Sequence, residues 1–126
     1  MAISTPGLVI SLEAASDLSA SQYCFLKQST TALRVALSTA DTDAIIGVLQ
    51  NKPSGVGRAA TVMVSGVSRV VASAAITAGA FVKPTTGGKA VATTTADDQA
   101  VGIALTTVAN ANEIVSVLLV PHLIAT

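Results

Sequence analysis

Apolar and polar positions alternate along this chain in short runs that are rich in β-branched residues and separated by turn-forming residues. Runs of this kind, spaced about ten residues apart, are typical of a β-sandwich or a small β-barrel. At residues 33–37 the alternation is clean, so one face is predicted to be buried while Arg34 points to water. The pattern predicts strands at 8–12, 23–27, 33–37, 45–50, 58–66, 67–72, 80–83, 89–93, 100–105 and 114–120.

Turn residues support the same all-β reading. The sequence Thr85-Thr86-Gly87-Gly88 predicts a hairpin, because two adjacent glycines accept positive φ between short strands. Only residues 73–79 have a helical pattern, about two turns that end at Gly79, and the same stretch also fits an irregular corner. The run 114–120 is nearly all apolar, which indicates a strand buried on both faces or an interface strand.

An internal repeat is the most informative feature of the sequence. Residues 43–49 align with residues 98–104 at an offset of 55 positions, and the same offset aligns 60–64 with 115–119. One further position of offset aligns Phe25-Leu26-Lys27 with Phe81-Val82-Lys83, and residues 35–36 with 91–92. We therefore expect Gly47 and Gly102 to occupy equivalent strand positions in two similar halves, where another group approaches closely.

The repeat predicts how the chain is divided. Each half exposes one sheet face and is marginal alone, so residues 18–126 are expected to form a single β domain with one shared core. The two pseudo-repeated halves are predicted at about 18–66 and 76–120.

Residues 1–17 lie outside this repeat and carry the apolar residues Leu8, Val9, Ile10 and Leu12 behind a flexible Pro6-Gly7. The segment is predicted to be an extended N-terminal arm that adds a strand to a neighbouring subunit. An ordinary edge strand of its own sheet is the alternative.

Composition changes the picture from a solitary domain to a component of an assembly. Of the 126 residues, 51% are hydrophobic but only 11% are charged and 2% are aromatic, and the formal net charge is zero. So few charges cannot keep the whole surface well solvated, so part of it is expected to be covered by copies of the chain or by a partner. Nucleic acid is not an expected partner, because there is no basic face and no aromatic platform.

Neither end of the chain nor its apolar runs indicate targeting or a membrane. The N-terminus lacks a positive n-region and a long apolar h-region, so a signal peptide is not expected. No apolar run reaches the roughly 20 residues of a membrane span. Cys24 is the single cysteine, so an intrachain disulfide is impossible.

Chemistry-bearing residues are sparse, and we predict no catalytic residue, no cofactor, no metal site and no enzyme activity. His122 is the single histidine and follows Pro121 at the end of an apolar strand, where a structural or interface role is expected. A nucleophilic pair of Cys24 and His122 has no local support, because no cation or helix N-terminus lowers the pKa of Cys24. A buried, inert thiol is the expected state.

Two other motifs are also better explained without chemistry. Gly87-Gly88-Lys89 resembles a phosphate loop, but Lys83 and Ala90 stand where that motif needs Gly and Ser or Thr. The flanks of Lys89 also differ from those of lipoyl or biotinyl carriers. Asp41, Asp43 and Asp97-Asp98 lie in matching turns, without the glycine bend and closing Glu of a calcium loop.

Residues 74–84, the turn through Gly87-Gly88-Lys89-Ala90, and the strand 100–104 form a recognisable series. This series resembles the small capsid decoration (cement) proteins of tailed bacteriophages, over roughly residues 18–120. That family has an Ala-Ile-Thr-x-Gly corner, a strand, a glycine hairpin, a Gly-x-Ala strand and a final valine strand. Residues 118–126 depart from it, since family members end soon after the valine strand.

The resemblance implies a structural protein on the capsid exterior, made in the host cytoplasm. Such proteins are often homotrimers and clamp neighbouring major capsid protein subunits by burying apolar area, without catalysis. The expected partners are therefore the major capsid protein and further copies of this chain, with no nucleic acid and no membrane. The residues predicted to make these contacts are Leu8, Val9, Ile10, Leu12, Leu119, Leu123 and Ile124.

Two other classes of function remain open at this point. One is a β-rich tail-fibre or adhesin module, which is disfavoured by one Tyr, two Phe and no Trp, because sugar sites favour aromatic faces. The other is an enzyme of unknown type, which is disfavoured by the missing acid–base constellation.

Overall fold

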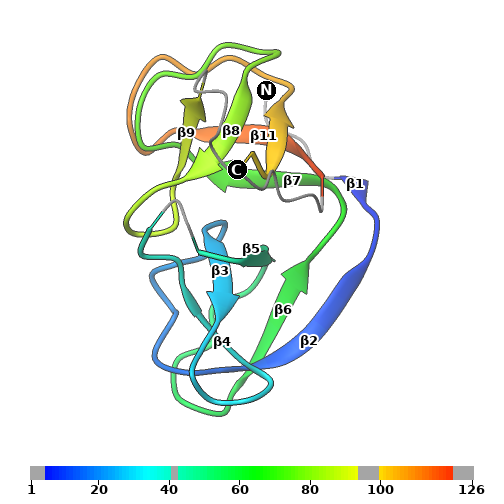
Figure 1. The fold of residues 1–126 in the computed structure, drawn as a ribbon, viewed down its shortest axis with the longest axis vertical. Coiled ribbons are helices and arrows are strands. Elements are labelled where there is room, and N and C mark those ends of the chain that lie inside the picture. Colours follow the sequence, from blue (N-terminus) through cyan, green and yellow to red (C-terminus); the bar gives the residue numbers. More distant parts are fainter. Residues whose placement is uncertain (1–4, 41–42, 94–99, 121–126) are drawn as a thin grey trace.

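The computed structural model describes residues 5–40, 43–93 and 100–120, and within them the chain is all-β, with eleven strands and no helix. The strands form two layers, a barrel and a sheet (Figure 1). The predicted all-β class, a small barrel or sandwich, is confirmed. The strands are β1 Thr5–Pro6, β2 Val9–Ala14, β3 Phe25–Gln28, β4 Arg34–Leu37, β5 Ile45–Leu49, β6 Ala59–Met63, β7 Gly66–Val71, β8 Phe81–Pro84, β9 Ala90–Thr93, β10 Gly102–Ala104 and β11 Ile114–Leu119.

Strands β2 to β6 form a closed barrel in the order β2-β4-β3-β5-β6. β2 closes it, because it pairs antiparallel with β6 and also parallel with β4, at Glu13↔Arg34 and Ala14↔Val35. Alternate residues of each strand point inward, so aliphatic side chains fill the interior. The buried residues of this interior are Ala14, Leu18, Leu26, Val35, Leu49, Ala60 and Val62.

Strands β7 to β11 form a six-stranded sheet together with β1, in the order β1-β7-β11-β10-β8-β9. β1 lies at one edge, where Thr5 pairs with Val67. Near the other edge the sheet curls toward its own β7, through a parallel bridge between Ala72 and Ala90. Its inner face buries Val70, Ala72, Ile76, Val82, Ala90, Val101, Ala104, Val108, Val115, Val117 and Leu119.

The barrel packs against this sheet through side chains that point out of the barrel. Phe25, Val48 and Met63 belong to the same buried cluster as the inner face of the sheet. The backbone also joins the layers, because the Phe25 N–H donates to the Gly88 carbonyl (2.7 Å) and the Val71 N–H to the Tyr23 carbonyl (2.9 Å). In Figure 1, β3 and β5 lie at this junction, below the sheet.

Each of the ten runs predicted from the sequence overlaps a strand of the structure. The short β1 was not predicted, because two residues carry no periodicity. Residues 73–79 form turns and one bridge, Ile76↔Val108, so the irregular corner is the right alternative there. The predicted hairpin is also present, with φ of 88° at Gly87 and 72° at Gly88.

Two five-stranded series follow the same pairing plan, and we call β2–β6 the first unit and β7–β11 the second unit. Val48↔Met63 joins β5 to β6, and Ile103↔Leu118 joins β10 to β11, with each partner 55 positions further along. The neighbouring pair Leu49↔Val62 corresponds in the same way to Ala104↔Val117. The ladders of the two units are therefore in the same register.

One predicted alignment is wrong by one residue. Residues 35–36 were aligned with 91–92, but Lys27 pairs with Ala36 whereas Lys83 pairs with Val91. The equivalent of Ala36 is therefore Val91. The sequence did not reveal this shift, because the short runs of Ala, Val and Thr in these strands look alike at either offset.

The predicted arm also needs correction, because residues 9–14 are a strand of the barrel of their own chain. Ile10↔Val62 in the first unit corresponds to Ser68↔Val117 in the second, so β2 is the counterpart of β7. The parallel pair Ala14↔Val35 likewise corresponds to the bridge Ala72↔Ala90. The first five-stranded unit thus begins at β2, inside the segment that was assigned to an arm.

Candidate docking surface

An apolar row crosses the outer face of the sheet of the second unit. Ile103 on β10 pairs with Phe81 on β8 and with Leu118 on β11, and Leu118 pairs with Val67 on β7. Because directly paired residues point to the same face of a sheet, these side chains stand side by side. Phe81 is 57% exposed and Leu118 is 38% exposed, while Ile103 and Val67 are half-buried. We call Phe81, Ile103 and Leu118 the outer row.

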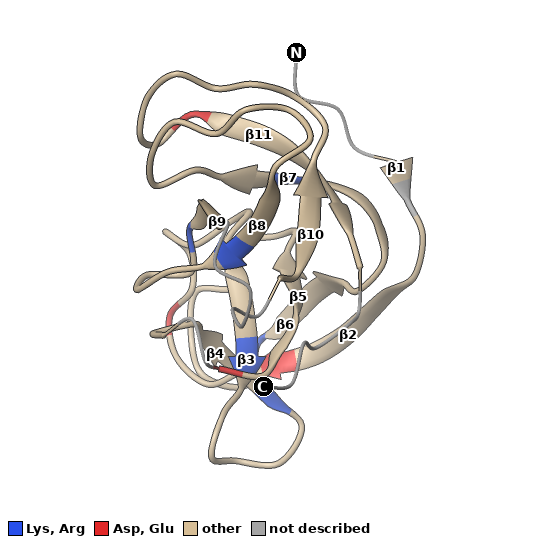
Figure 2. Cartoon of the chain, turned by 45° about the horizontal axis from the view of Figure 1, so that its top comes forward, with Lys and Arg blue, Asp and Glu red and all other residues tan. Residues whose placement is uncertain are grey.

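A shallow hollow of about 100 Å³ adjoins the outer row. Its lining is apolar and consists of Phe81, Ala100, Gly102, Ile103 and Val120. Charged residues are sparse along the described part of the chain, as the coloured cartoon of Figure 2 shows, and none of these lining residues is charged. Hydrophobic patches of this kind on a protein surface mark sites of interaction.

The matching row of the first unit is covered within the molecule. Phe25 pairs with Val48, and Val48 pairs with Met63, in the same register as the outer row. All three are buried, because they pack against the second unit. A row of this kind is therefore a packing surface in one unit and an exposed surface in the other.

The residues predicted to make contacts fall into four groups. Leu8 (58% exposed) and Val9 lie on the surface, whereas Ile10 and Leu12 are half-buried against the barrel interior. Leu119 is 7% exposed and belongs to the core of the second unit, so little of its side chain is open to a partner. Leu123 and Ile124 lie outside the described residues.

Sequence reasoning missed the outer row. The repeat aligned Phe81 with Phe25, but nothing in the local pattern shows that one is buried and the other exposed. Leu118 and Leu119 are adjacent leucines in a nearly all-apolar strand, and only the direction of each side chain separates them. The alternation of strand faces was the available signal, and the all-apolar run concealed it.

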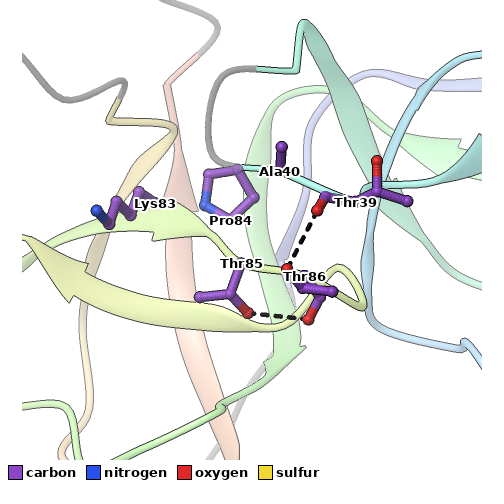
Figure 3. A pocket seen from close by; sticks show the side chains of 6 residues that line it. All are labelled: Thr39, Ala40, Lys83, Pro84, Thr85 and Thr86. Atoms are coloured by element: carbon purple, nitrogen blue, oxygen red, sulfur yellow. Dashed lines mark hydrogen bonds between the residues drawn. The ribbon is translucent and has the colours of Figure 1, made fainter.

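A polar crevice of about 360 Å³ lies where the two units meet (Figure 3). The Thr86 hydroxyl donates to the Thr39 carbonyl across it (3.2 Å). It is lined by Thr39, Ala40, Lys83, Pro84, Thr85 and Thr86, none of which is aromatic. The crevice therefore offers hydroxyls and one ammonium group, without a face on which a sugar ring stacks.

Cys24 is buried, as expected of an inert thiol. Burial raises the pKa of the Cys24 thiol, and the nearby Lys89 ammonium opposes this to a smaller extent. A raised pKa keeps the sulfur protonated and weakly nucleophilic at neutral pH. His122, the other member of the pair considered from the sequence, lies outside the described residues.

Asp43 has a structural role in the turn before β5. The Thr39 N–H donates to its carboxylate (2.9 Å), the Ala40 N–H also donates (3.1 Å), and the Lys27 ammonium lies 3.6 Å away. The Thr39 bond, supported by the Ala40 bond and by Lys27, holds the pKa of Asp43 below its ordinary value, against a smaller opposing effect of burial. Asp41, Asp97 and Asp98 lie outside the described residues.

Two other kinds of site are absent from the part of the chain that the structure describes. No group of three or more His, Cys, Asp or Glu side chains is placed to hold a metal ion. No helix there has the length and apolar character needed to cross a membrane.

The fold and the surface define a class, that of a small all-β structural protein whose most distinctive surface is an uncovered apolar sheet face. Comparison with known families then makes the assignment, because the model of the phage cement protein family matches residues 4–119. The chain belongs to the phage cement protein family and is a structural protein of a phage head.

A solved structure shares the fold. The N base of the head fiber gp8.5 of bacteriophage phi29 is similar to this chain with a TM-score of 0.69 and 17% sequence identity. The match covers 94% of this chain and 100% of that one. No curated protein matches the chain.

Proposed function

We propose that this protein binds the outer surface of the phage head and stabilises the contacts between major capsid protein subunits. The observation that carries the proposal is the match to the phage cement family over residues 4–119, and the exposed row of Phe81, Ile103 and Leu118 supports burial against other subunits of the assembly. Exposing such a row costs free energy in a solitary protein, because apolar area favours removal from water. A partner that covers the row recovers that free energy.

The energetics of such a clamp need no special chemistry. Burying an exposed aliphatic or aromatic side chain completely contributes about 1.5–3 kcal/mol. A few such side chains within an interface of about 1,600 Å² give useful affinity. Many copies on one lattice then strengthen a modest contact through avidity.

The proposal extends to partners and place. The protein is made in the host cytoplasm, assembles as a homotrimer and attaches to the capsid exterior. Leu8 and Val9 contact the major capsid protein, since both are exposed where the closing strand β2 begins. Leu123 and Ile124 are further candidates for this contact. Catalysis, cofactors and metals play no part.

The test is reconstitution on phage heads that lack this protein. Purified protein is mixed with undecorated heads, and co-sedimentation measures binding while heating measures the temperature at which the heads release their DNA. We expect saturable binding and a higher release temperature. Heads that neither bind the protein nor gain stability from it contradict the proposal.

A paired variant locates the contact. Leu8→Asp with Val9→Asp is expected to weaken head binding at least about tenfold, because a buried interface disfavours unpaired carboxylates. The control is Val56→Asp, which places one carboxylate at another exposed apolar position. The alternative of a tail-fibre or adhesin module would instead show binding to cell-surface glycans and none to heads.

A further inference from the structure

The two units differ in what covers them, although their strands are paired alike. The row Phe25, Val48 and Met63 of the first unit is buried, and the equivalent outer row of the second unit is open to solvent. The second unit therefore exposes an apolar surface that is equivalent to the one with which the first unit packs against it.

The residues that face the interior of each unit differ in the opposite sense, because those of the second unit are buried and their equivalents in the first unit are only half-buried. Ser68 and Val70 on β7 are buried, but their equivalents on β2, Ile10 and Leu12, are only half-buried. Two further pairs of residues, each related by the 55-position offset, differ in burial in the same way. Val101 and Leu119 are buried in the second unit, whereas Ile46 and Val64 are half-buried in the first. We call Ile10, Leu12, Ile46 and Val64 the open slot.

Inside the chain, the row of the first unit packs in one buried cluster with Val70, Val101 and Leu119, the second-unit equivalents of Leu12, Ile46 and Val64. At the rim of this contact the Gln50 amide donates to the Ser68 hydroxyl (3.0 Å). The equivalent of Gln50 is Leu105. The Gln50 N–H donates to the Thr61 carbonyl and the Leu105 N–H donates to the Ser116 carbonyl, both at 2.8 Å, and donors and acceptors are each 55 positions apart. The equivalent of Ser68 is Ile10. Between two copies, the apolar pair of Leu105 and Ile10 would therefore take the place of the hydrogen-bonded pair of Gln50 and Ser68.

We propose that the outer row of the second unit packs into the open slot of the first unit of another copy of this chain, head to tail. Both surfaces are apolar, the outer row is largely exposed and the residues of the open slot are half-buried, and Leu105 and Ile10 are both apolar at the rim. The occupant is a second copy because a row of this kind already fits a slot of this kind within the chain. This inference rests on the self-association in the proposed function.

The contact between copies differs from the one within the chain at one point. In the first unit the Glu13 N–H donates to the Leu33 carbonyl (3.2 Å), and the side chains of Glu13 and Arg34 form an ion pair (3.1 Å). In the second unit the equivalent groups are the Val71 N–H and the Gly88 carbonyl. The Val71 N–H donates to the Tyr23 carbonyl of the first unit, and the Gly88 carbonyl accepts from the Phe25 N–H. Copies therefore join through side-chain packing, without insertion of a strand.

A head-to-tail contact of this kind has a consequence for assembly. It joins two different surfaces, so it produces a closed ring when its rotation divides a full turn and an open filament otherwise. A trimer built in this way is a ring of six units, in which every row is covered and every slot is filled.

Cysteine cross-linking tests the pairing directly. In a Cys24→Ala background, one sample carries Leu105→Cys and another carries Ile10→Cys, and the two are mixed before mild oxidation. The mixture is expected to give a disulfide-linked dimer, and neither variant alone is expected to do so. Val56→Cys in place of Ile10→Cys is the control, and the experiment is run both in solution and on heads.

A charge variant tests the row itself. Phe81→Glu is expected to weaken self-association by about 100-fold or more, because docking would bury an unpaired carboxylate. Sedimentation velocity measures the association, and the unfolding transition shows that the variant is folded. Val56→Glu, at a similarly exposed apolar position, is expected to associate like the wild type.

Three results overturn the inference. They are a wild-type protein that is monomeric both in solution and on heads, the absence of the mixed cross-link, and unchanged self-association of Phe81→Glu. If Phe81→Glu loses head binding but associates normally, the row contacts the major capsid protein, which contradicts this inference and leaves the proposed function standing. If heads bind no wild-type protein but the mixed cross-link forms, the proposed function fails and this contact stands.

Discussion

Gly47 and Gly102 lie at the same point of two different ladders. A Cβ atom on Gly47 would collide with the Met63 carbonyl and the Val62 side chain, and one on Gly102 would collide with the Leu118 carbonyl and the Val117 side chain. Each pair of obstacles is 55 positions from the other. Both glycines are therefore required by the close approach of the neighbouring strand.

The first prediction concerns these two glycines. We expect Gly47→Ala and Gly102→Ala each to lower the free energy of unfolding by about 1–3 kcal/mol, because backbone has to shift to admit the methyl group. Urea denaturation measures the loss. Gly55→Ala is the control, because the nearest atom to its added Cβ, the Arg58 Nε, is 3.7 Å away. Alanine variants as stable as the wild type would show that the strands adjust freely.

The second prediction separates two adjacent leucines. Leu119→Ala is expected to cost about 2–5 kcal/mol of stability, because its side chain is in the core of the second unit. Leu118→Ala is expected to change stability little, because Leu118 is in the outer row, but to weaken self-association. Thermal unfolding and sedimentation velocity on both variants give the two readouts. Equal stability losses would contradict the assignment of the two faces.

The third prediction is that β2 is essential to the fold. Deleting residues 1–12 removes most of the strand that pairs with both β6 and β4, so we expect the barrel to lose its cooperative unfolding transition. Deleting residues 1–7 is the control, because it leaves β2 intact and removes the edge pairing of β1 and the bond from the Gly7 N–H to the Ser65 carbonyl. Circular dichroism during heating reports both. A 13–126 chain that melts like the wild type would restore the arm hypothesis.

The fourth prediction concerns pH. Asp43 has a lowered pKa in the folded state, so its contribution to stability is fully present above its ordinary pKa and is lost as the pH falls through its folded-state value. We expect Asp43→Asn to cost about 1–2 kcal/mol at pH 7, because two backbone donors lose a charged acceptor. The difference from the wild type should shrink below about pH 4. A difference that is constant from pH 7 to pH 2.5 would assign it to packing.

Much of the fold was predictable because it depends on local pattern. Alternation with a period of two residues identifies a strand wherever it occurs, and adjacent glycines identify a hairpin such as that at Gly87 and Gly88. The 55-position repeat also indicated the equivalence of Gly47 and Gly102. The course of β2 was not predictable in this way, since an exposed arm and a barrel strand have the same sequence of Val9, Ile10 and Leu12.

Phe25 and Phe81 show most clearly what the sequence determined and what only the tertiary structure decided. Each begins an apolar strand that continues to a lysine, and this local sequence is enough to place both phenylalanines at equivalent strand positions. Phe25 is fully buried, whereas Phe81 is 57% exposed. The cause is not local, because burial here depends on whether another five-stranded unit packs against the row. The first unit has that neighbour within its own chain, and the described chain supplies no equivalent unit for the outer row of the second.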